Sequence, residues 1–175
     1  MQTLKLVFLF SWLTIFSCAQ RPKENAEKLN WLTLDEVTAK LQQEKRPVLI
    51  DLYTDWCGWC KVMDKRTYGN DKVRAYITEK FYPVKLNAES RKTITWNGKE
   101  FEFNARQGAN DFAVWLTNGQ LSFPTTVFIA ADGEPQAIPG FLAPGELELL
   151  VKYFGEGHYG KIPFGKWQKE FKSTW

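Results

Sequence analysis

The chain has 175 residues, of which 44% are hydrophobic, and its formal net charge at pH 7 is +3. This length and composition support one domain with a substantial hydrophobic core and leave too little chain for two. Acidic and basic residues are mixed along the sequence, which argues against a nucleic-acid-binding surface and assigns most charges to solvated faces.

The N-terminal residues are typical of a secretory signal. After Lys5 the segment 6–16 is almost wholly apolar, and no acidic residue occurs before Glu24. About 20 apolar residues are needed to cross the hydrocarbon core of a bilayer, so this run is too short to span it. Its length fits the apolar core of a signal peptide, which we predict over residues 1–17.

The signal ends in a sequence that resembles the cleavage box of bacterial lipoproteins. Residues 15–18 are Ile-Phe-Ser-Cys, with a small residue before the cysteine. We therefore predict that Cys18 is lipidated, that residues 18–30 form a polar tether, and that the protein is a membrane-anchored lipoprotein of the bacterial periplasm. An ordinary secretory peptide with a chance cysteine is the alternative.

Helices and strands are expected to alternate between residues 31 and 87. They are, in order, a helix that begins in the capping box 33–36 and ends near 46–47, a strand over 48–53, a helix from 57 to 66, a helix after 69–71 and a strand over 81–87. A strand, helices and a second strand within this length require a right-handed crossover, so the two strands should be parallel.

Turn residues mark the remaining elements. These are a hairpin over 93–103 around Asn97-Gly98, a short helix capped by Asn110 or Asp111, a strand over 126–130, an antiparallel partner over 136–141 and a helix from Pro144 to about Phe154. The tail 155–175 is rich in aromatic residues, so we expect it to pack onto the domain.

The pair Cys57 and Cys60 is the feature with the clearest chemistry. It follows the first buried strand, so both sulfur atoms should lie at the first turn of the next helix. There, free backbone N–H groups and the helix dipole favour a thiolate and can lower the pKa of the first cysteine from about 8.5 to between about 3.5 and 7.5. If Cys18 carries lipid, this is the one remaining pair among three cysteines, and no structural disulfide is left.

These residues belong to a longer pattern that resembles thioredoxin. An acid stands six positions before the first cysteine, residues 56–61 are Trp-Cys-Gly-Trp-Cys-Lys, residues 84–87 are Val-Lys-Leu-Asn, and Pro124-Thr125 precedes a strand. The resemblance covers residues 31–154. The pattern is also similar to the C-terminal domain of the transmembrane thiol:disulfide interchange proteins.

The resemblance implies an α/β thioredoxin fold. We expect a central mixed β-sheet flanked by helices over residues 31–154, with an inserted β-hairpin within about 90–122, before a cis-proline. Residues 155–175 form an aromatic C-terminal extension.

The resemblance also implies catalytic roles for four residues. Cys57, expected to be the more exposed cysteine, attacks a substrate disulfide to form a mixed disulfide, and Cys60 resolves it. Asp51 lies in a buried strand, where its pKa should rise, and helps to move the proton of the resolving thiol, with Lys85 beside it. Alternatively, Asp51 is a structural acid and Lys85 a surface residue.

Further residues are implied in substrate binding. Pro124 matches the family's cis-proline, which turns the backbone N–H and C=O of Phe123 towards an extended substrate segment. Gly58 and Trp59 line the turn between the cysteines, and Trp56 and Trp59 offer an apolar docking surface. A trans turn proline at position 124 and core packing of Trp56 are the alternatives.

Together these features predict a thiol:disulfide oxidoreductase that reduces disulfides of extracytoplasmic proteins. It should be monomeric, use no metal or other cofactor, and receive electrons from a membrane thiol donor. Strongly oxidising relatives often carry a histidine where this chain has Trp59, which favours a thioredoxin-like potential. The alternatives are a disulfide oxidase or isomerase, and a non-catalytic binding or chaperone lipoprotein. A zinc site would need a second pair of ligands, and His158 lies in the tail as a surface or packing residue.

Overall fold

The computed structural model describes residues 28–130 and 133–175. The predicted signal peptide (1–17), the lipidation site Cys18 and the tether up to residue 27 lie outside the described residues. Within the part of the chain that is described, no helix is long and apolar enough to cross a membrane.

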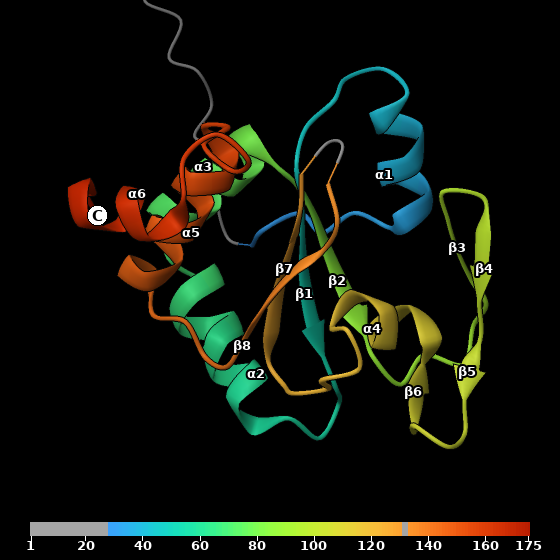
Figure 1. Cartoon of the computed structure of the whole chain (residues 1–175). Coiled ribbons are helices and arrows are strands. Elements are labelled where there is room, and N and C mark those ends of the chain that lie inside the picture. Colours follow the sequence, from blue (N-terminus) through green and yellow to red (C-terminus); the bar gives the residue numbers. More distant parts are fainter. Residues whose placement is uncertain (1–27, 131–132) are drawn as a thin grey trace, which may run out of the picture.

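A four-stranded mixed sheet forms the centre of the molecule, and helices lie on both its faces (Figure 1). The strand order is β2-β1-β7-β8, with bounds β1 Val48–Tyr53, β2 Tyr82–Asn87, β7 Thr125–Ile129 and β8 Gln136–Pro139. As predicted, β1 is parallel to β2, and β8 is antiparallel to β7; β7 is also antiparallel to β1. The predicted α/β fold class with a central mixed sheet is confirmed.

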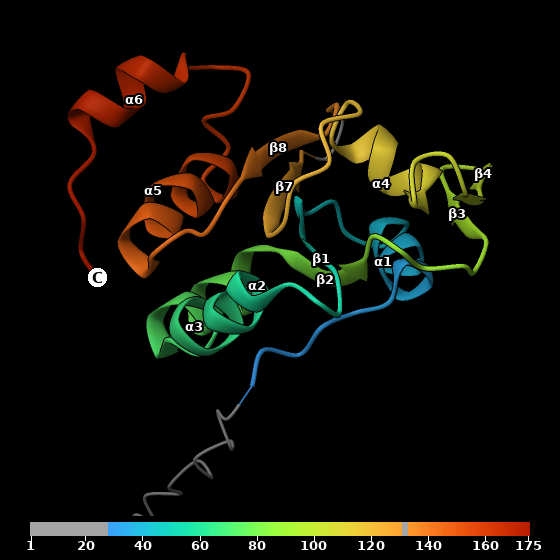
Figure 2. The same ribbon diagram turned by 90° about the horizontal axis from the view of Figure 1, so that it is seen from below.

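Two separate cores cover the two faces of the sheet, because side chains alternate along each strand. Ile50 and Leu52 of β1 enter the first core, together with side chains from α1 (Leu34–Leu41) and α4 (Asp111–Leu116). Leu49 enters the second core, which is built with α2 (Gly58–Met63), α3 (Asp71–Lys80) and α5 (Pro144–Gly155). Figure 2 shows the two groups of helices on opposite sides of the sheet. Asp51 is two residues after Leu49 in β1, so both side chains point to the same face of the sheet, the one covered by α2.

The first helix begins as predicted and ends early. Thr33 Oγ1 accepts a hydrogen bond from the Glu36 N–H at 3.2 Å, and Glu36 Oε2 accepts one from the Thr33 N–H at 2.8 Å, which completes the capping box. The helix ends at Leu41 rather than near residues 46–47. Residues 42–46 are all polar and offer no apolar side chain to bury, so packing does not extend the helix.

The helix predicted over residues 57–66 continues to residue 68. After α2 the chain widens into a π-helical turn, η1 (Asp64–Tyr68), in which Thr67 and Tyr68 are buried. Thr67 Oγ1 donates a hydrogen bond to the carbonyl oxygen of Leu142 at 2.6 Å. This bond ties the end of the helix to the segment before α5.

The hairpin predicted around Asn97-Gly98 is present. It joins β3 (Ile94–Trp96) to β4 (Lys99–Phe101), and both turn residues have positive φ angles, 50° and 77°. A second antiparallel pair, β5 (Phe103–Asn104) and β6 (Ala109–Asn110), was not predicted, since two-residue strands show no alternation in the sequence. Of the two candidate caps for α4, Asn110 is the one used, accepting from the Phe112 N–H at 2.9 Å.

The C-terminal residues contact α5 through an aromatic cluster. Tyr153 contacts the rings of Tyr159, Phe164 and Trp167, and the last two of these lie on α6 (Phe164–Glu170). These rings join the second core, so that core extends from the sheet, through α5, to the tail.

A buried carboxylate fixes the end of the tail. Glu148 of α5 has no exposed surface and accepts hydrogen bonds from Lys152 Nζ (2.8 Å), Ser173 Oγ (2.5 Å), and the N–H and Oγ1 of Thr174 (2.9 and 2.8 Å). Burial opposes the charge of Glu148, but these donors outweigh it and lower its pKa to about 2. The last residues are thereby held on α5.

Candidate active site

Cys57 and Cys60 form a disulfide at the start of α2, with an S–S distance of 2.05 Å. Cys57 is the N-cap residue, and its Sγ accepts a hydrogen bond from the Cys60 N–H at 3.0 Å. A thiolate on Cys57 would accept the same bond, which favours the ionised form. Cys57 was expected to be the more exposed cysteine, but both are buried, with exposed fractions of 4% and 3%. With both sulfur atoms covered, the helix position rather than exposure distinguishes the two.

Short contacts shape the turn that carries the disulfide. β1 ends at Tyr53, and the Cys57 N–H donates to the Thr54 carbonyl oxygen at 3.1 Å. The Asn87 side chain, at the end of β2, donates to Asp55 at 3.1 Å. The parallel pair of strands therefore fixes where α2 begins.

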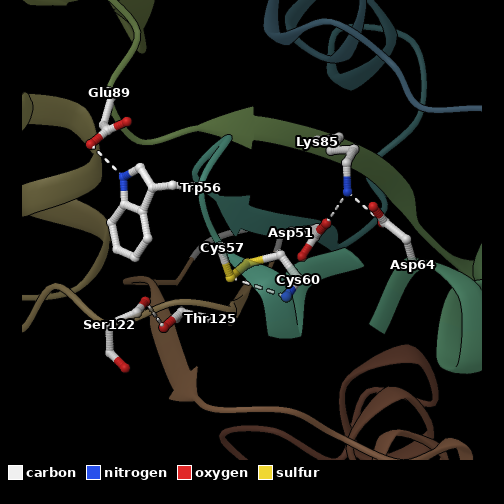
Figure 3. Close-up of a disulfide and its surroundings, with 9 residues drawn as sticks. All are labelled: Asp51, Trp56, Cys57, Cys60, Asp64, Lys85, Glu89, Ser122 and Thr125. Carbon is white, nitrogen blue, oxygen red and sulfur yellow. Dashed lines mark hydrogen bonds and ion pairs between the residues drawn. A yellow bond between two sulfur atoms is a disulfide. The ribbon is translucent and has the colours of Figure 1, made fainter. Parts of the chain in front are cut away.

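Asp51 lies beneath the disulfide and is almost completely buried, with 1% of its surface exposed. Figure 3 shows its carboxylate between Cys60 and Lys85. Oδ2 accepts a hydrogen bond from Lys85 Nζ at 2.5 Å, whereas Oδ1 has no hydrogen-bond partner within residues 28–130 and 133–175. Burial raises the pKa of Asp51 to about 6, against the opposing charge of Lys85. This pKa lies closer to neutral pH than that of an ordinary aspartate.

Lys85 connects this acid to a second carboxylate. It stands opposite Asp51 in the β1–β2 register, and its Nζ also donates to Asp64 Oδ1 at 2.5 Å (Figure 3). Burial disfavours the ammonium, but the two carboxylates outweigh it, so the pKa of Lys85 is raised. Lys85 is therefore a partly buried residue, with 22% of its side chain exposed, that pairs with Asp51.

A cavity of about 500 Å³ opens beside this ion-pair group. Lys85 and Asp64 line this cavity. The ion-pair group of Asp64, Lys85 and Asp51 therefore reaches from the cavity to the buried Asp51. The other lining residues are Lys28, Leu29, Trp31, Lys61, Lys65, Tyr68 and Gly69.

The face of the disulfide is framed by exposed aromatic residues. Trp56 and Trp59 are 68% and 62% exposed, and they are the large hydrophobic side chains most exposed among the described residues. Trp56 contacts Phe123 and Trp59 contacts Phe141, with ring centroids 5.9 and 5.6 Å apart. The alternative that Trp56 packs in the core is therefore wrong. Its indole N–H donates a hydrogen bond to Glu89 Oε1 at 2.9 Å, at the surface (Figure 3).

The Phe123–Pro124 peptide bond is cis, so the trans alternative is wrong. Figure 3 shows the neighbouring residues Ser122 and Thr125 opposite the disulfide, joined by a hydrogen bond of 2.7 Å. Within the described ranges, neither the N–H nor the C=O of Phe123 takes part in a backbone hydrogen bond. That backbone is therefore available for an added strand.

The family model of the thioredoxin-like domain matches residues 34–155, which is most of the chain. The chain belongs to the thioredoxin-like family. It is 32% identical over 114 residues to the thiol:disulfide interchange proteins DsbD of Salmonella typhi and Escherichia coli strain K12. That match covers 63% of this chain and 17% of either relative, so the chain spans about a sixth of their length.

Solved structures of thioredoxin-like proteins share the fold. A DsbH oxidoreductase superposes with a TM-score of 0.54 at 19% identity, over 79% of this chain and 93% of that one. A thioredoxin-fold protein from Helicobacter pylori gives a TM-score of 0.54 at 17% identity, over 71% and 83% of the two chains. The predicted membership of the thioredoxin-like superfamily is thus confirmed, and the chain is a thioredoxin-like disulfide oxidoreductase by family.

The sequence interpretation of this thioredoxin-like site missed Asp64, Glu89 and Phe141. Asp64 follows Cys60 by four residues, and this helical spacing could have placed it on the same face as the resolving cysteine. No local signal marks Glu89 or Phe141, because each meets its tryptophan only through the tertiary fold. Among residues 28–130 and 133–175, no group of three His, Cys, Asp or Glu side chains is placed to hold a metal ion.

Proposed function

We propose that this thioredoxin-like protein reduces disulfides of extracytoplasmic proteins with the electrons of its Cys57–Cys60 dithiol. The disulfide at the start of α2, with Asp51 buried beneath it, is the observation that carries this proposal. The names of the interchange proteins that match the chain agree with thiol–disulfide exchange.

The reaction proceeds by two exchanges. The Cys57 thiolate attacks one sulfur of the substrate disulfide, which forms a mixed disulfide and releases the other substrate sulfur as a thiolate. The Cys60 thiol gives its proton to Asp51, and the Cys60 thiolate attacks the Cys57 sulfur. The enzyme disulfide forms, the second substrate thiolate leaves, and both substrate thiolates take up protons. Two electrons pass from enzyme to substrate.

The substrate is held as an extended segment beside Pro124. The unpaired backbone of Phe123 would add it as a strand, in the manner of β-augmentation. The turn over Gly58 and the exposed rings of Trp56 and Trp59 would contact apolar side chains on either side of the substrate cysteine.

The reducing direction requires an external electron source. Trp59 adds no ionisable group between the cysteines, which supports a thioredoxin-like potential over a strongly oxidising one. We expect a separate membrane-bound dithiol to reduce the Cys57–Cys60 disulfide after each turnover. Lipidation of Cys18 would keep the monomeric protein at the membrane of the periplasm, near such a donor.

The reduction potential of the Cys57–Cys60 pair tests the direction. A value near that of thioredoxin, about −270 mV, supports a reductase, whereas one near about −120 mV would establish an oxidase. Insulin reduction with dithiothreitol tests the activity itself. The variant Cys57→Ser should abolish the acceleration, and equal rates for wild type and variant would favour a passive binding protein.

A trapping experiment separates the roles of the cysteines. The variant Cys60→Ser should accumulate a covalent adduct with a disulfide-bearing protein, because the mixed disulfide is no longer resolved. The matched variant Cys57→Ser should form much less, and non-reducing gel electrophoresis measures both. Equal adduct formation would contradict the assignment of Cys57 as the nucleophile.

A further inference from the structure

The ammonium group of Lys85 is enclosed by two aromatic rings as well as two carboxylates. Its Nζ lies 4.7 Å from the ring centroid of Tyr53 and 5.3 Å from that of Trp31. Both distances fall within the range of about 6 Å at which a cation is attracted to a ring face. Asp51 and Asp64 occupy other sides of the same nitrogen atom.

The two rings come from different parts of the fold. Tyr53 is the last residue of β1. Trp31 precedes α1 and is held in place because the Leu32 N–H donates to the Pro83 carbonyl oxygen at 2.8 Å, alongside β2. Trp31 also packs edge-on against Tyr68, with centroids 4.9 Å apart. Segments before and after the first helix thus converge on one nitrogen atom.

We propose that Trp31 and Tyr53 are positioning residues that hold the Lys85 ammonium against Asp51. This inference rests on the proposed function, because it concerns the proton that Asp51 takes from Cys60. A lysine has a flexible four-carbon stem, and Lys85 lines a cavity large enough for its head group to turn towards water. The rings oppose that movement, since each attracts the cation only while it stays over the ring face.

The position of Lys85 controls the charge of Asp51. The ammonium opposes the rise in pKa that burial produces, so its withdrawal should raise the pKa of Asp51 further. The ionisable groups around Asp51 are Lys85 on β2, Asp64 and Tyr68 on η1, and the two cysteine thiols once α2 is reduced. Burial raises the pKa of Tyr68 well above its ordinary value, so Tyr68 stays neutral over the relevant pH range.

The rate of mixed-disulfide resolution as a function of pH tests the proposal. Purified, fully reduced protein is mixed with a single-disulfide peptide in a single turnover, and enzyme oxidation is followed between pH 5 and 8. In the wild type the rate should rise as Asp51 ionises. In Trp31→Leu the rise should move to higher pH by about 0.5–1 unit, the shift that corresponds to an ordinary cation–π contact. Trp31→Phe, which keeps a ring, should move it less.

A matched control exists at the other end of the chain. Lys152 Nζ also binds a buried carboxylate, Glu148, and lies 5.7 Å from the ring of Trp175. Trp175→Leu therefore removes a comparable ring from a lysine–carboxylate pair. It controls for any general loss of stability and should leave the pH profile of disulfide resolution unchanged. Tyr53→Leu provides a second test on β1 and should shift the profile in the same direction as Trp31→Leu.

The outcomes are distinct. A wild-type profile in folded Trp31→Leu or Tyr53→Leu would overturn the positioning role and leave the proposed reductase intact. An equal shift in Trp175→Leu would also overturn it, since a general loss of stability would then explain the effect. Absence of any exchange in the wild type would refute the proposed function, and the inference with it.

Discussion

Asp51 is an acid in a place where its charge is poorly solvated. Its pKa is raised from 3.8 to about 6 by burial, so the folded protein binds more protons at this group than the unfolded chain between about pH 4 and 6. Stability attributable to Asp51 therefore falls as the pH rises through that window, and the penalty persists above it. This cost is consistent with the role in proton transfer that we propose for Asp51.

The variant Asp51→Asn should separate these two effects. We expect resolution of the mixed disulfide to slow by about 10²-fold at pH 7, because a proton acceptor is lost. The same variant should be more stable by about 1–3 kcal/mol at pH 7, and the dependence of stability on pH between 4 and 6 should weaken. Rapid-quench kinetics and chemical denaturation measure the two changes.

Asp55→Asn is the control for this substitution. Asp55 is exposed and accepts a hydrogen bond from Asn87 at the end of β2. It should leave both the pH dependence of stability and the resolution rate almost unchanged. Resolution that is unslowed in Asp51→Asn would remove Asp51 from the mechanism.

The exposed tryptophans should matter for protein substrates alone. Trp59→Ala is expected to raise the KM for a disulfide-bearing protein by about tenfold, because an apolar contact of the docking surface is lost. Rates with a small aromatic-free disulfide should change by less than about twofold. Steady-state kinetics with both substrates measure this, and equal losses on both would instead indicate damage to the cysteines' surroundings.

At the scale of elements, α5 links the sheet to the end of the chain. Its inner residues Leu147 and Val151 lie in the second core, while Glu148 on the same helix binds the C-terminal residues. The tail is therefore fastened by one carboxylate as well as by its aromatic rings. Because this carboxylate must be ionised to bind its donors well, we expect the attachment of the tail to weaken at low pH.

Glu148→Gln should reveal that sensitivity. The pKa of Glu148 is lowered from 4.5 to about 2, so the stability it contributes is present above about pH 4.5 and is lost as the pH falls towards 2. We expect the variant to be less stable by about 1–3 kcal/mol at pH 7, since several donors lose a charged acceptor. Its stability should also change less between pH 4.5 and 2.

Thermal denaturation over this pH range measures the effect, with Glu170→Gln as control. Glu170 is an exposed glutamate of α6, and its substitution should change stability little. If Glu148→Gln and Glu170→Gln were indistinguishable, the Glu148 contacts would contribute nothing to holding the tail.

At the scale of the whole molecule, we propose that the predicted tether, residues 18–30, connects a lipid on Cys18 to the thioredoxin-like domain. Cys18→Ser should remove the lipid and release the protein from the membrane fraction. Metabolic labelling with a radioactive fatty acid, followed by fractionation, measures both. Disulfide exchange by the released protein should be unaffected, and retention of label in the variant would exclude Cys18 as the lipidated residue.

The parts of the fold that were predictable depend on local signals. The Thr33–Glu36 capping box and the Asn97-Gly98 turn are set by neighbours within four residues, and both appear as predicted. The cysteine pair and the cis-proline at 124 followed from a motif. The surroundings of Lys85 were only partly predicted. The spacing of four residues from Cys60 could have placed Asp64 on the same helix face, but Trp31 reaches Lys85 through tertiary packing that no sequence spacing records.

The contact of Leu32 with β2 has a consequence for solubility. β2 is an edge strand, and an uncovered edge invites pairing with another molecule and hence aggregation. The Leu32 N–H donates a hydrogen bond to the Pro83 carbonyl oxygen, which faces the open side of β2, and Leu32 forms a parallel bridge with Val84. The N–H and C=O of one strand residue face the same side, so the N–H that proline lacks would also have faced outward. The segment that brings Trp31 to the site thereby covers this edge at Pro83 and Val84, where a second chain could otherwise extend the sheet.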